Sequence, residues 1–320
     1  MTRTFGVALV GFALLGVAML GAQQPLFRGD SDTVRVFVTV TDRDGRLVTS
    51  LPQDTFEIRD NGRPQPITLF DNSPQPIQLV VMLDVSGSMS GNLELLRAAA
   101  DALFARLRPD DRVRVGSFGS TIEIAPTFTA DREALRAALP HQIAPDAPTP
   151  LWLAIDEAMN AFGDSSDDTR RVVLVLSDGR DSGGIGFRRR PMSQVQVIDD
   201  ARLRDVMVYA IGMRSRGSRG PSIGVGVGLG SLQSTLLADM PDAGLARVAE
   251  ETGGGYLEIR PSEDLSAAFA RVADELHSQY LIGFPLPSRD GRVHELDVRV
   301  SRSGLRPRAR KDYVAPAAAP

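Results

Sequence analysis

The sequence predicts an α/β fold, in which a doubly wound, mostly parallel sheet is inserted between N- and C-terminal β segments that form a small β-sandwich. Two observations lead to this prediction. Through the middle of the chain, uninterrupted apolar runs alternate with stretches of helical periodicity, which is typical of buried parallel strands separated by helices. At both ends, apolar and polar residues alternate between short turn signals, which is typical of antiparallel strands.

Length and composition exclude several classes of protein. The chain has 320 residues, of which 42% are hydrophobic and 24% charged, so it can bury a core and is not disordered throughout. Its 36 basic and 40 acidic side chains give a formal charge of −4, which argues against bulk nucleic-acid binding. There is no cysteine, which excludes a disulfide scaffold and a thiolate zinc site. Any metal must therefore be held by oxygen or imidazole.

The first 22 residues are typical of a secretory signal peptide. An uncharged apolar run from Phe5 to Leu20 follows Arg3, and the small residue Ala22 suits cleavage. The run is at the lower limit for spanning a bilayer, so an uncleaved N-terminal anchor is the alternative. We therefore expect export to the periplasm, the cell envelope or the extracellular space, with membrane contact only through this segment.

Residues 31–75 form the predicted N-terminal β unit. Strand patterns occur at 34–40, 56–58 and 67–70. Asp60-Asn61-Gly62 is a hairpin-type turn. The unit is too short to bury much core alone, so we expect it to need a partner.

Residues 76–278 form the predicted α/β domain. Four apolar runs predict its buried strands, and they are 79–83, 113–118, 172–176 and 206–211. Three stretches with apolar residues at helical spacing predict its helices, and they are 96–107, 151–162 and 265–276.

The β pattern returns in residues 279–314. Its predicted strands are 280–284, 293–300 and 306–310. We expect them to pair with the N-terminal β unit, so that both ends of the chain build one sandwich around the inserted domain. Residues 315–320 are predicted to be a disordered tail.

Polar side chains follow the predicted strands at the points where they end. Asp84, Ser86 and Ser88 come directly after the first buried strand and before a helix. Asp178 ends the third strand, and Thr149 opens the helix that precedes that strand. Ligands bind at the carboxyl ends of strands in such a sheet, and carboxylates and hydroxyls are donors that Mg²⁺ prefers. These five residues therefore predict an oxygen-only metal site.

Each element also has an ordinary structural interpretation. Asp and Ser after a strand can cap the next helix. Thr149 before Pro150 suits a plain helix start, and Asp178-Gly179 is a common turn dipeptide. All three elements occur in one order, each at a strand end or helix start, and this combination favours the metal site.

The order Asp-x-Ser-x-Ser, distant Thr, distant Asp resembles the metal-ion-dependent adhesion site, or MIDAS, of the von Willebrand factor A (VWA) family. Asp84, Ser86 and Ser88 match the first element, Thr149 the second and Asp178 the third. The resemblance covers the predicted α/β domain and implies a Rossmann-like fold that holds Mg²⁺, Mn²⁺ or Ca²⁺. It also implies a protein ligand whose Asp or Glu carboxylate completes the coordination, so that the output is binding and not catalysis.

A narrower resemblance covers nearly all of the chain after the signal peptide. It is to a VWFA-related group of exported bacterial proteins, abundant in acidobacteria. The segments that carry it are 56–62, 252–254, 280–284 and 312–313.

Two loops after the third and fourth buried strands are rich in arginine. Their position predicts that they lie on the rim of the metal site, where they would steer an acidic partner towards the ion. Solvated loop charge is the alternative interpretation. The residues are Arg188, Arg189, Arg190, Arg214, Arg216 and Arg219.

Three functions compete. The first is a non-catalytic, metal-dependent adhesion or protein-interaction module of the bacterial cell envelope. The second is a Mg²⁺-dependent phosphatase-like hydrolase with Asp84 as nucleophile, but such enzymes need a carboxylate two residues later, where this chain has Ser86. The third is an accessory partner of an AAA-type ATPase, which the signal peptide disfavours. The three histidines are scattered, and no Ser, His and Asp set suggests a catalytic triad. We expect the first function.

Overall fold

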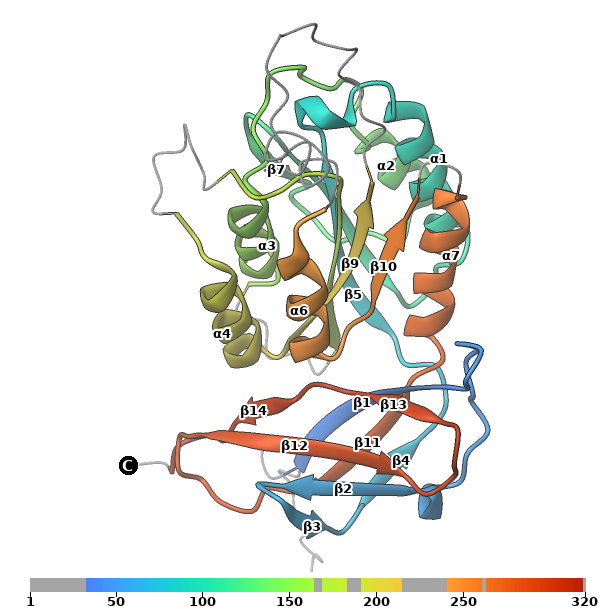
Figure 1. The fold of residues 1–320 in the computed structure, drawn as a ribbon, viewed down its shortest axis with the longest axis vertical. Coiled ribbons are helices and arrows are strands. Elements are labelled where there is room, and N and C mark those ends of the chain that lie inside the picture. Colours follow the sequence, from blue (N-terminus) through green and yellow to red (C-terminus); the bar gives the residue numbers. More distant parts are fainter. Residues whose placement is uncertain (1–32, 164–168, 183–190, 215–240, 261–262, 319–320) are drawn as a thin grey trace, which may run out of the picture. The chain divides into compact units, whose positions relative to one another are not determined.

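Three β-sheets form the part of the chain that the structure describes, a computed structural model (Figure 1). The described residues are 33–163, 169–182, 191–214, 241–260 and 263–318, and all belong to one compact unit. The predicted signal peptide lies outside them. Within these ranges, no helix is both long and apolar enough to cross a bilayer.

The central six-stranded sheet has the order β10-β9-β8-β5-β6-β7. All neighbouring strands are parallel except β6 and β7, which are antiparallel. The strands are β5 (Ile77–Asp84), β6 (Arg112–Phe118), β7 (Ile122–Ile124), β8 (Arg170–Ser177), β9 (Val206–Met213) and β10 (Tyr256–Ile259). The predicted doubly wound, mostly parallel sheet is therefore confirmed.

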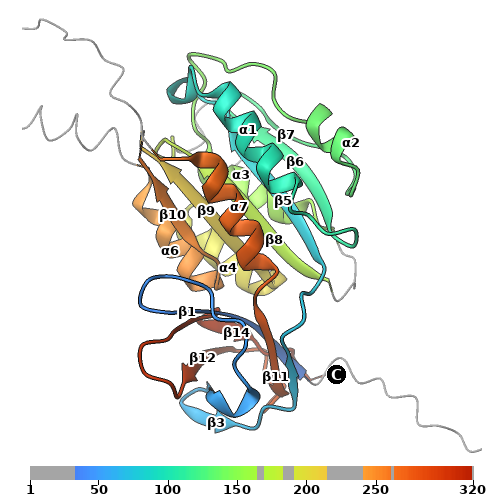
Figure 2. The same cartoon turned by 90° about the vertical axis from the view of Figure 1, so that its right-hand side faces the viewer.

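Helices cover both faces of this sheet (Figures 1 and 2). One face packs against α1 (Leu93–Phe104), α2 (Arg132–Ala137) and α7 (Leu265–Leu276). The other face packs against α3 (Leu151–Asn160), α4 (Gln194–Arg204) and α6 (Ala243–Thr252). Two 3₁₀ helices are η1 (Gln53–Thr55) and η2 (Gly87–Met89).

Strand alternation decides which way the polar residues at the strand ends point. In β5, Val80 and Met82 belong to the core under α3, α4 and α6, and Asp84 continues this series. In β8, Val173 and Val175 belong to the same core, and Ser177 continues that series. The ends of two adjacent strands therefore direct a carboxylate and a hydroxyl to one side of the sheet.

Both ends of the chain build the β-sandwich, as predicted. One sheet has the order β13-β1-β11-β4 and the other β14-β12-β2-β3, so N- and C-terminal strands pair in both. Asn61 and Gly62 join β2 to β3 with positive φ angles, which confirms the predicted hairpin turn. The strands are β1 (Thr33–Thr41), β2 (Phe56–Asp60), β3 (Arg63–Gln65), β4 (Leu69–Asp71), β11 (Tyr280–Pro285), β12 (Val293–Val300), β13 (Arg306–Arg308) and β14 (Asp312–Val314).

The structure adds elements that the sequence analysis did not predict. They are β7, β10, α2, α4 and α6. The two strands lie at the edges of the sheet and are only half-buried, so they lack the continuous apolar run of a central strand. Helix α4 buries only Val197, Ile198 and Ala201, too few for a clear apolar stripe.

The C-terminal tail is more ordered than expected over residues 315–318. Ala315 is fully buried in the sandwich core and donates its backbone N–H to Arg292. Ala317 forms a bridge with Asp290. These backbone contacts correct the prediction of disorder for residues 315–318, because the turn between β11 and β12 gives the segment a pairing partner.

Candidate metal site

Asp84 ends β5 at the carboxyl edge of the central sheet, the upper edge in Figure 1. Its side chain is fully buried. Oδ1 accepts the backbone N–H of Ser86 at 2.9 Å, and Oδ2 accepts the Ser177 hydroxyl at 2.5 Å. Both carboxylate oxygens are thus oriented by the two adjacent strand ends.

Hydroxyl groups link the loop after β5 to the end of β8. The Oγ atoms of Ser86 and Ser88 are 3.0 Å apart, and Ser88 donates its hydroxyl to Asp178 Oδ1 at 2.6 Å. Ser86 and Asp178 are buried, whereas Ser88 is exposed. The group therefore extends from the interior to the surface.

Thr149 reaches the same edge from a third segment. A Cβ atom added to Gly179 would lie 3.0 Å from Thr149 Oγ1, so this hydroxyl lies beside the residue that follows Asp178. The backbone carbonyl of Thr149 accepts the N–H of Ser182 at 2.9 Å. The structure thus brings together all five residues that the sequence singled out as metal ligands, and their role as ligands stays a prediction.

Gly87 lets two of these segments approach each other. A Cβ atom at this position would lie 1.8 Å from the backbone oxygen of Pro145, a distance that no side chain tolerates. The N–H of Gly87 donates to the carbonyl of Ala147 at 3.2 Å. The loop that carries Thr149 therefore packs directly on η2, and only glycine fits at the contact.

Two carboxylates at this edge favour a cation. Burial raises the pKa of Asp84 to about 7, although hydrogen bonds from Ser177 and Ser86 lower it. The negative charge of Asp178 raises this pKa further. Among the described residues, no arginine or lysine pairs with Asp84. A divalent cation would offset this concentration of negative charge.

The donors fit a hard cation. Carboxylate and hydroxyl oxygens suit Mg²⁺, Mn²⁺ and Ca²⁺. Across the described ranges, no group of three or more His, Asp and Glu side chains forms a potential metal site. The residues that would hold the ion here are therefore two carboxylates, Asp84 and Asp178, and three hydroxyls, Ser86, Ser88 and Thr149.

Sequence analysis missed several residues that support the site. Ser177 directly precedes Asp178, and its place at a buried strand end was a usable signal. Asp181 accepts the N–H of Trp152 at 3.3 Å and donates its own N–H to Asp242 at 3.2 Å. These contacts tie the loop after β8 to the starts of α3 and α6, and nothing in the sequence pattern indicated them.

The predicted arginine rim is described at one position only. Arg214 follows β9 and forms an ion pair with Glu258 of β10. This partner offsets much of its charge. The other five arginines of the rim lie outside the described residues, so the steering hypothesis stays a prediction.

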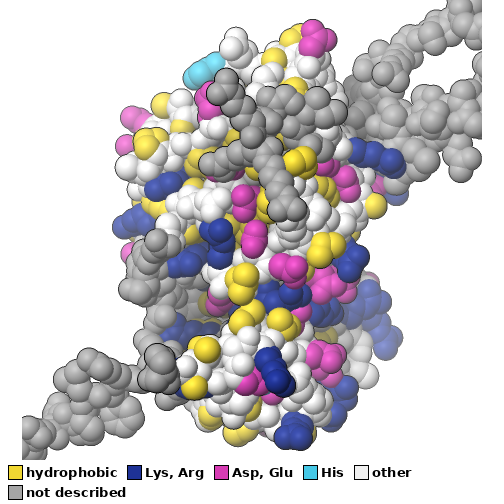
Figure 3. All heavy atoms as spheres, turned by 90° about the vertical axis from the view of Figure 1, so that its left-hand side faces the viewer, with side chains coloured by type: hydrophobic (Ala, Val, Ile, Leu, Met, Phe, Trp, Pro, Cys, Tyr) yellow, Lys and Arg dark blue, Asp and Glu magenta, His cyan; other side chains and the backbone are white. Residues whose placement is uncertain are grey.

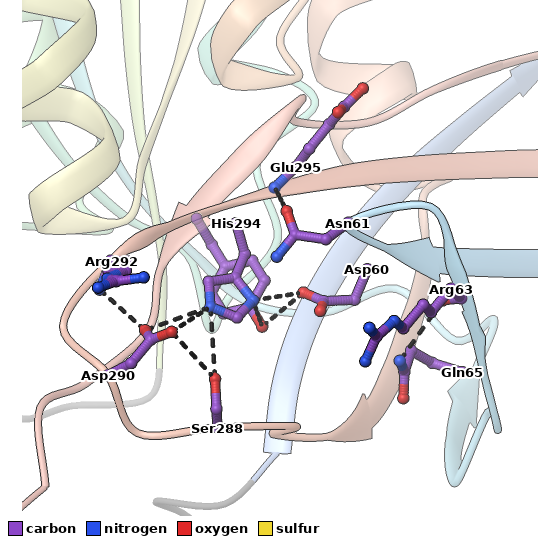
Figure 4. Close-up of polar contacts among 10 residues, drawn as sticks. Asp60, Asn61, Arg63, Gln65, Ser288, Asp290, Arg292, His294 and Glu295 are labelled. Atoms are coloured by element: carbon purple, nitrogen blue, oxygen red, sulfur yellow. Dashed lines mark hydrogen bonds and ion pairs between the residues drawn. The ribbon is translucent and has the colours of Figure 1, made fainter.

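A Ser, His and Asp row does occur, but in the β-sandwich (Figure 4). His294 Nδ1 lies 2.8 Å from Asp60, and Nε2 lies 3.5 Å from the Ser288 hydroxyl. Asp290 lies 3.3 Å from the same Nε2 and also accepts the Ser288 hydroxyl. Burial alone would lower the pKa of His294, but Asp60 and Asp290 outweigh it and raise this pKa. Both ring nitrogens of His294 already face carboxylates, Asp60 at Nδ1 and Asp290 at Nε2, so the row is structural.

Residues 79–180 match the family model of the von Willebrand factor type A domain. The matched segment contains all five predicted ligands. This part of the chain is therefore similar to a VWA domain, a family whose members commonly mediate metal-dependent protein interactions through a MIDAS motif and are generally non-enzymatic. No curated protein matches the sequence.

Solved structures with a similar fold come from several organisms. BatB from Bacteroides thetaiotaomicron is 16% identical over 62% of this chain and 98% of its own, with a TM-score of 0.44. A von Willebrand factor type A protein from Catenulispora acidiphila is 11% identical over 90% of this chain and 75% of its own, with a TM-score of 0.47. Proximal thread matrix protein 1 from the mussel byssus, with a zinc-occupied MIDAS motif, is 16% identical over 67% of this chain and 48% of its own, with a TM-score of 0.43.

Proposed function

We propose that this protein is a non-catalytic interaction module of the bacterial cell envelope that binds an acidic group of a protein partner through a divalent cation. The ligands of the cation would be Asp84, Ser86, Ser88, Thr149 and Asp178. The observation that carries the proposal is the 2.6 Å hydrogen bond from Ser88 to Asp178, because it joins the two loops that supply the carboxylates.

The charge balance of the ligands explains why binding is the expected output. Two carboxylates neutralise a divalent ion, and hydroxyl ligands add no charge, so the ion stays receptive to one more carboxylate. Ser88 is exposed next to the buried carboxylates, which gives a partner access from solvent. Mg²⁺ is the first candidate, and Mn²⁺ or Ca²⁺ would serve the same role.

Export and the narrower bacterial group belong to this proposal. The apolar N-terminal run supports export. Thr252-Gly253-Gly254 is one of the segments that carry the resemblance to the exported group. A cytoplasmic partner of an AAA-type ATPase would share the site but differ in location, so fractionation of a tagged protein separates the two.

The geometry argues against Asp84 as an enzymatic nucleophile. Its side chain is fully buried, and both of its oxygens accept hydrogen bonds. The residue two positions later is Ser86, where phosphoryl transfer through an aspartate needs a second carboxylate.

Thermal unfolding of the exported chain with and without cation tests the metal site. We expect Mg²⁺ or Mn²⁺ to raise the midpoint, by about 2.7 kcal/mol of stabilisation at 100 times the dissociation constant. Asp84→Ala removes the shift, and Asp110→Ala, which removes an exposed carboxylate elsewhere, keeps it. A folded wild type with no metal-dependent shift contradicts the site.

A pull-down from the native envelope tests the partner. Crosslinked wild type should capture a partner in Mg²⁺ but not in chelator, and Ser86→Ala should capture it in neither. Capture that is equal in all samples would place the partner elsewhere on the surface.

A further inference from the structure

A cavity lies at the edge of the central sheet opposite the metal site, where β8 and β9 begin. It is lined by these strand starts, by residues of α4, α6, β1 and β14, and by Arg310 between β13 and β14. Figure 2 shows β8 and α4 next to β1 and β14 in this region. The volume of the cavity is about 280 Å³. This is near the lower end of the range of small-molecule sites, roughly 300 to 1,000 Å³.

Basic side chains dominate the charged lining of the cavity. Six arginines line it against three carboxylates. Figure 3 shows basic and acidic side chains interspersed on the face that carries α4. The arginines are Arg35, Arg170, Arg171, Arg202, Arg204 and Arg310.

Some of these arginines form ion pairs. Arg202 pairs with Asp312 at 2.5 Å and with Asp199 at 2.6 Å, and Arg310 pairs with Asp205. The third carboxylate is Glu251, whose side chain lies 4.0 Å from Arg247, a residue outside the lining. By count, the lining has three more arginines than carboxylates.

Arg170 is the most unusual of these arginines. It is only 6% exposed, and it donates hydrogen bonds to the Gln279 side chain and to the Leu276 carbonyl. Neither acceptor is charged, although the negative charge of Asp111 acts on the guanidinium. The Nε atom of Arg170 has no hydrogen-bond partner among the described residues. Its guanidinium lies 4.7 Å from the centre of the Phe37 ring. Burial lowers its pKa to about 10, which still leaves it charged at neutral pH.

A buried cation of this kind is costly without an anion. A buried charge destabilises a protein unless a counter-charge or polar partners offset it. The planar guanidinium matches carboxylate and phosphate groups. Apolar side chains line the rest of the cavity, among them Phe37, Ile198 and Met207. They favour a ligand that also has an apolar body.

We propose that this cavity binds a small organic anion, in which one carboxylate or phosphate group pairs with Arg170 and an apolar body of one ring or a short chain packs against Phe37, Ile198 and Met207. The site is separate from the metal site, at the other end of the strands. It therefore stands or falls independently of the metal-dependent function.

Four probes test the proposal on the full exported chain in EDTA, which prevents carboxylates from binding through a metal. They are benzoate, phenyl phosphate, neutral benzyl alcohol and inorganic phosphate. We expect benzoate or phenyl phosphate to raise the thermal midpoint by about 2 °C at ten times its dissociation constant. Benzyl alcohol lacks the anionic group and inorganic phosphate lacks the apolar body, so both should bind at least tenfold more weakly. The preferred aromatic probe identifies the anionic group.

Three variants connect the binding to the cavity. Arg170→Gln should weaken the preferred probe at least tenfold. Ile198→Trp fills the cavity from α4 and should do the same without touching the buried arginine. Arg112→Gln is the matched control, because Arg112 starts β6 at the same edge of the sheet but does not line the cavity.

Each of three results would overturn the proposal. Either no probe binds a folded wild type at 10 mM by saturation-transfer NMR, or benzyl alcohol binds as tightly as the preferred aromatic anion, or Ile198→Trp and a folded Arg170→Gln bind that anion as tightly as Arg112→Gln. A concentration of 10 mM corresponds to a binding free energy near −3 kcal/mol, a limit that a paired guanidinium should exceed.

Discussion

The metal edge of the central sheet and the His294 cluster of the β-sandwich hold their buried polar groups in opposite ways. At the metal edge, the carboxylates of Asp84 and Asp178 are near enough for the charge of one to raise the pKa of the other. In the sandwich, His294 lies between Asp60 and Asp290, so the carboxylates there face a group that can carry the opposite charge (Figure 4). The second arrangement is satisfied by the chain itself, whereas the first gains from an added cation. An excess of negative charge, more than burial, therefore distinguishes the predicted metal site from the sandwich cluster.

The largest effect is expected from a substitution that separates η2 from the loop that carries Thr149. In Gly87→Val the new side chain meets the Pro145 carbonyl, so the loop that carries Thr149 must move away from η2. We expect a loss of about 3 kcal/mol of stability, as for overpacking against backbone, together with loss of the metal response. Urea unfolding with and without Mg²⁺ measures both.

Ser90→Ala is the control for this change, since Ser90 is exposed just after η2. It should keep the metal response and nearly all of the stability. A Gly87→Val protein that still gains stability from Mg²⁺ would show that the Thr149 loop is not needed for the site.

A substitution in the sandwich cluster should lower the stability but leave the metal response intact. Asp60→Asn removes a buried charge that accepts hydrogen bonds from His294 and Tyr313. Hydrogen bonds to charged groups contribute about 1.5 to 3 kcal/mol, so we expect a loss of about 2 kcal/mol. The Mg²⁺-dependent shift should stay unchanged. Asp54→Asn, at an exposed position, should cost nothing measurable, and a smaller metal shift in Asp60→Asn would mean that the two regions are coupled.

The same cluster predicts a pH dependence. Because Asp60 and Asp290 raise the pKa of His294 above 6.5, its contribution is fully present below pH 6.5 and is lost as the pH rises through the folded-state pKa. Between pH 6 and pH 8.5, the thermal midpoint of the wild type should therefore fall more than that of His294→Gln. Parallel curves for the two proteins would contradict the raised pKa of His294.

These regions also differ in how far the sequence predicts them. The meeting of the five predicted ligands could be anticipated because parallel strands end at one edge, so residues that follow different strands lie close together there. The contact of Gly87 with Pro145 was not, since it depends on the path of a loop without a periodic pattern. Asp60 and His294 lie 234 positions apart, and no local pattern joins them. Pairing of β2 with β12 brings them together.

Ser177 allows a finer test of the metal edge. Ser177→Ala removes the hydroxyl that orients Asp84, and we expect about tenfold weaker metal binding and a loss of about 1 kcal/mol of stability. Ser182→Ala is a matched control in the loop after β8, because the buried Ser182 hydroxyl has no hydrogen-bond partner among the described residues. It should leave both quantities unchanged. Isothermal titration with Mn²⁺ measures the affinities, and equal affinity in both variants would mean that Asp84 needs no such support.

The smallest effect is expected at Arg214. Its charge is paired with Glu258, just as the polar groups of the sandwich cluster are paired with one another. The side chain of Arg214 is 40% exposed and that of Glu258 32%. A pair so open to solvent contributes less than about 1 kcal/mol, but it still cancels most of the long-range field of the arginine. Arg214→Gln should therefore change the rate at which an oligoglutamate peptide associates in Mg²⁺ by less than about twofold, whereas Glu258→Gln, which leaves the arginine unpaired, should raise that rate and its salt dependence. Stopped-flow measurements at two ionic strengths distinguish these outcomes. A several-fold slower association in Arg214→Gln would instead mean that Arg214 steers acidic partners despite its ion pair.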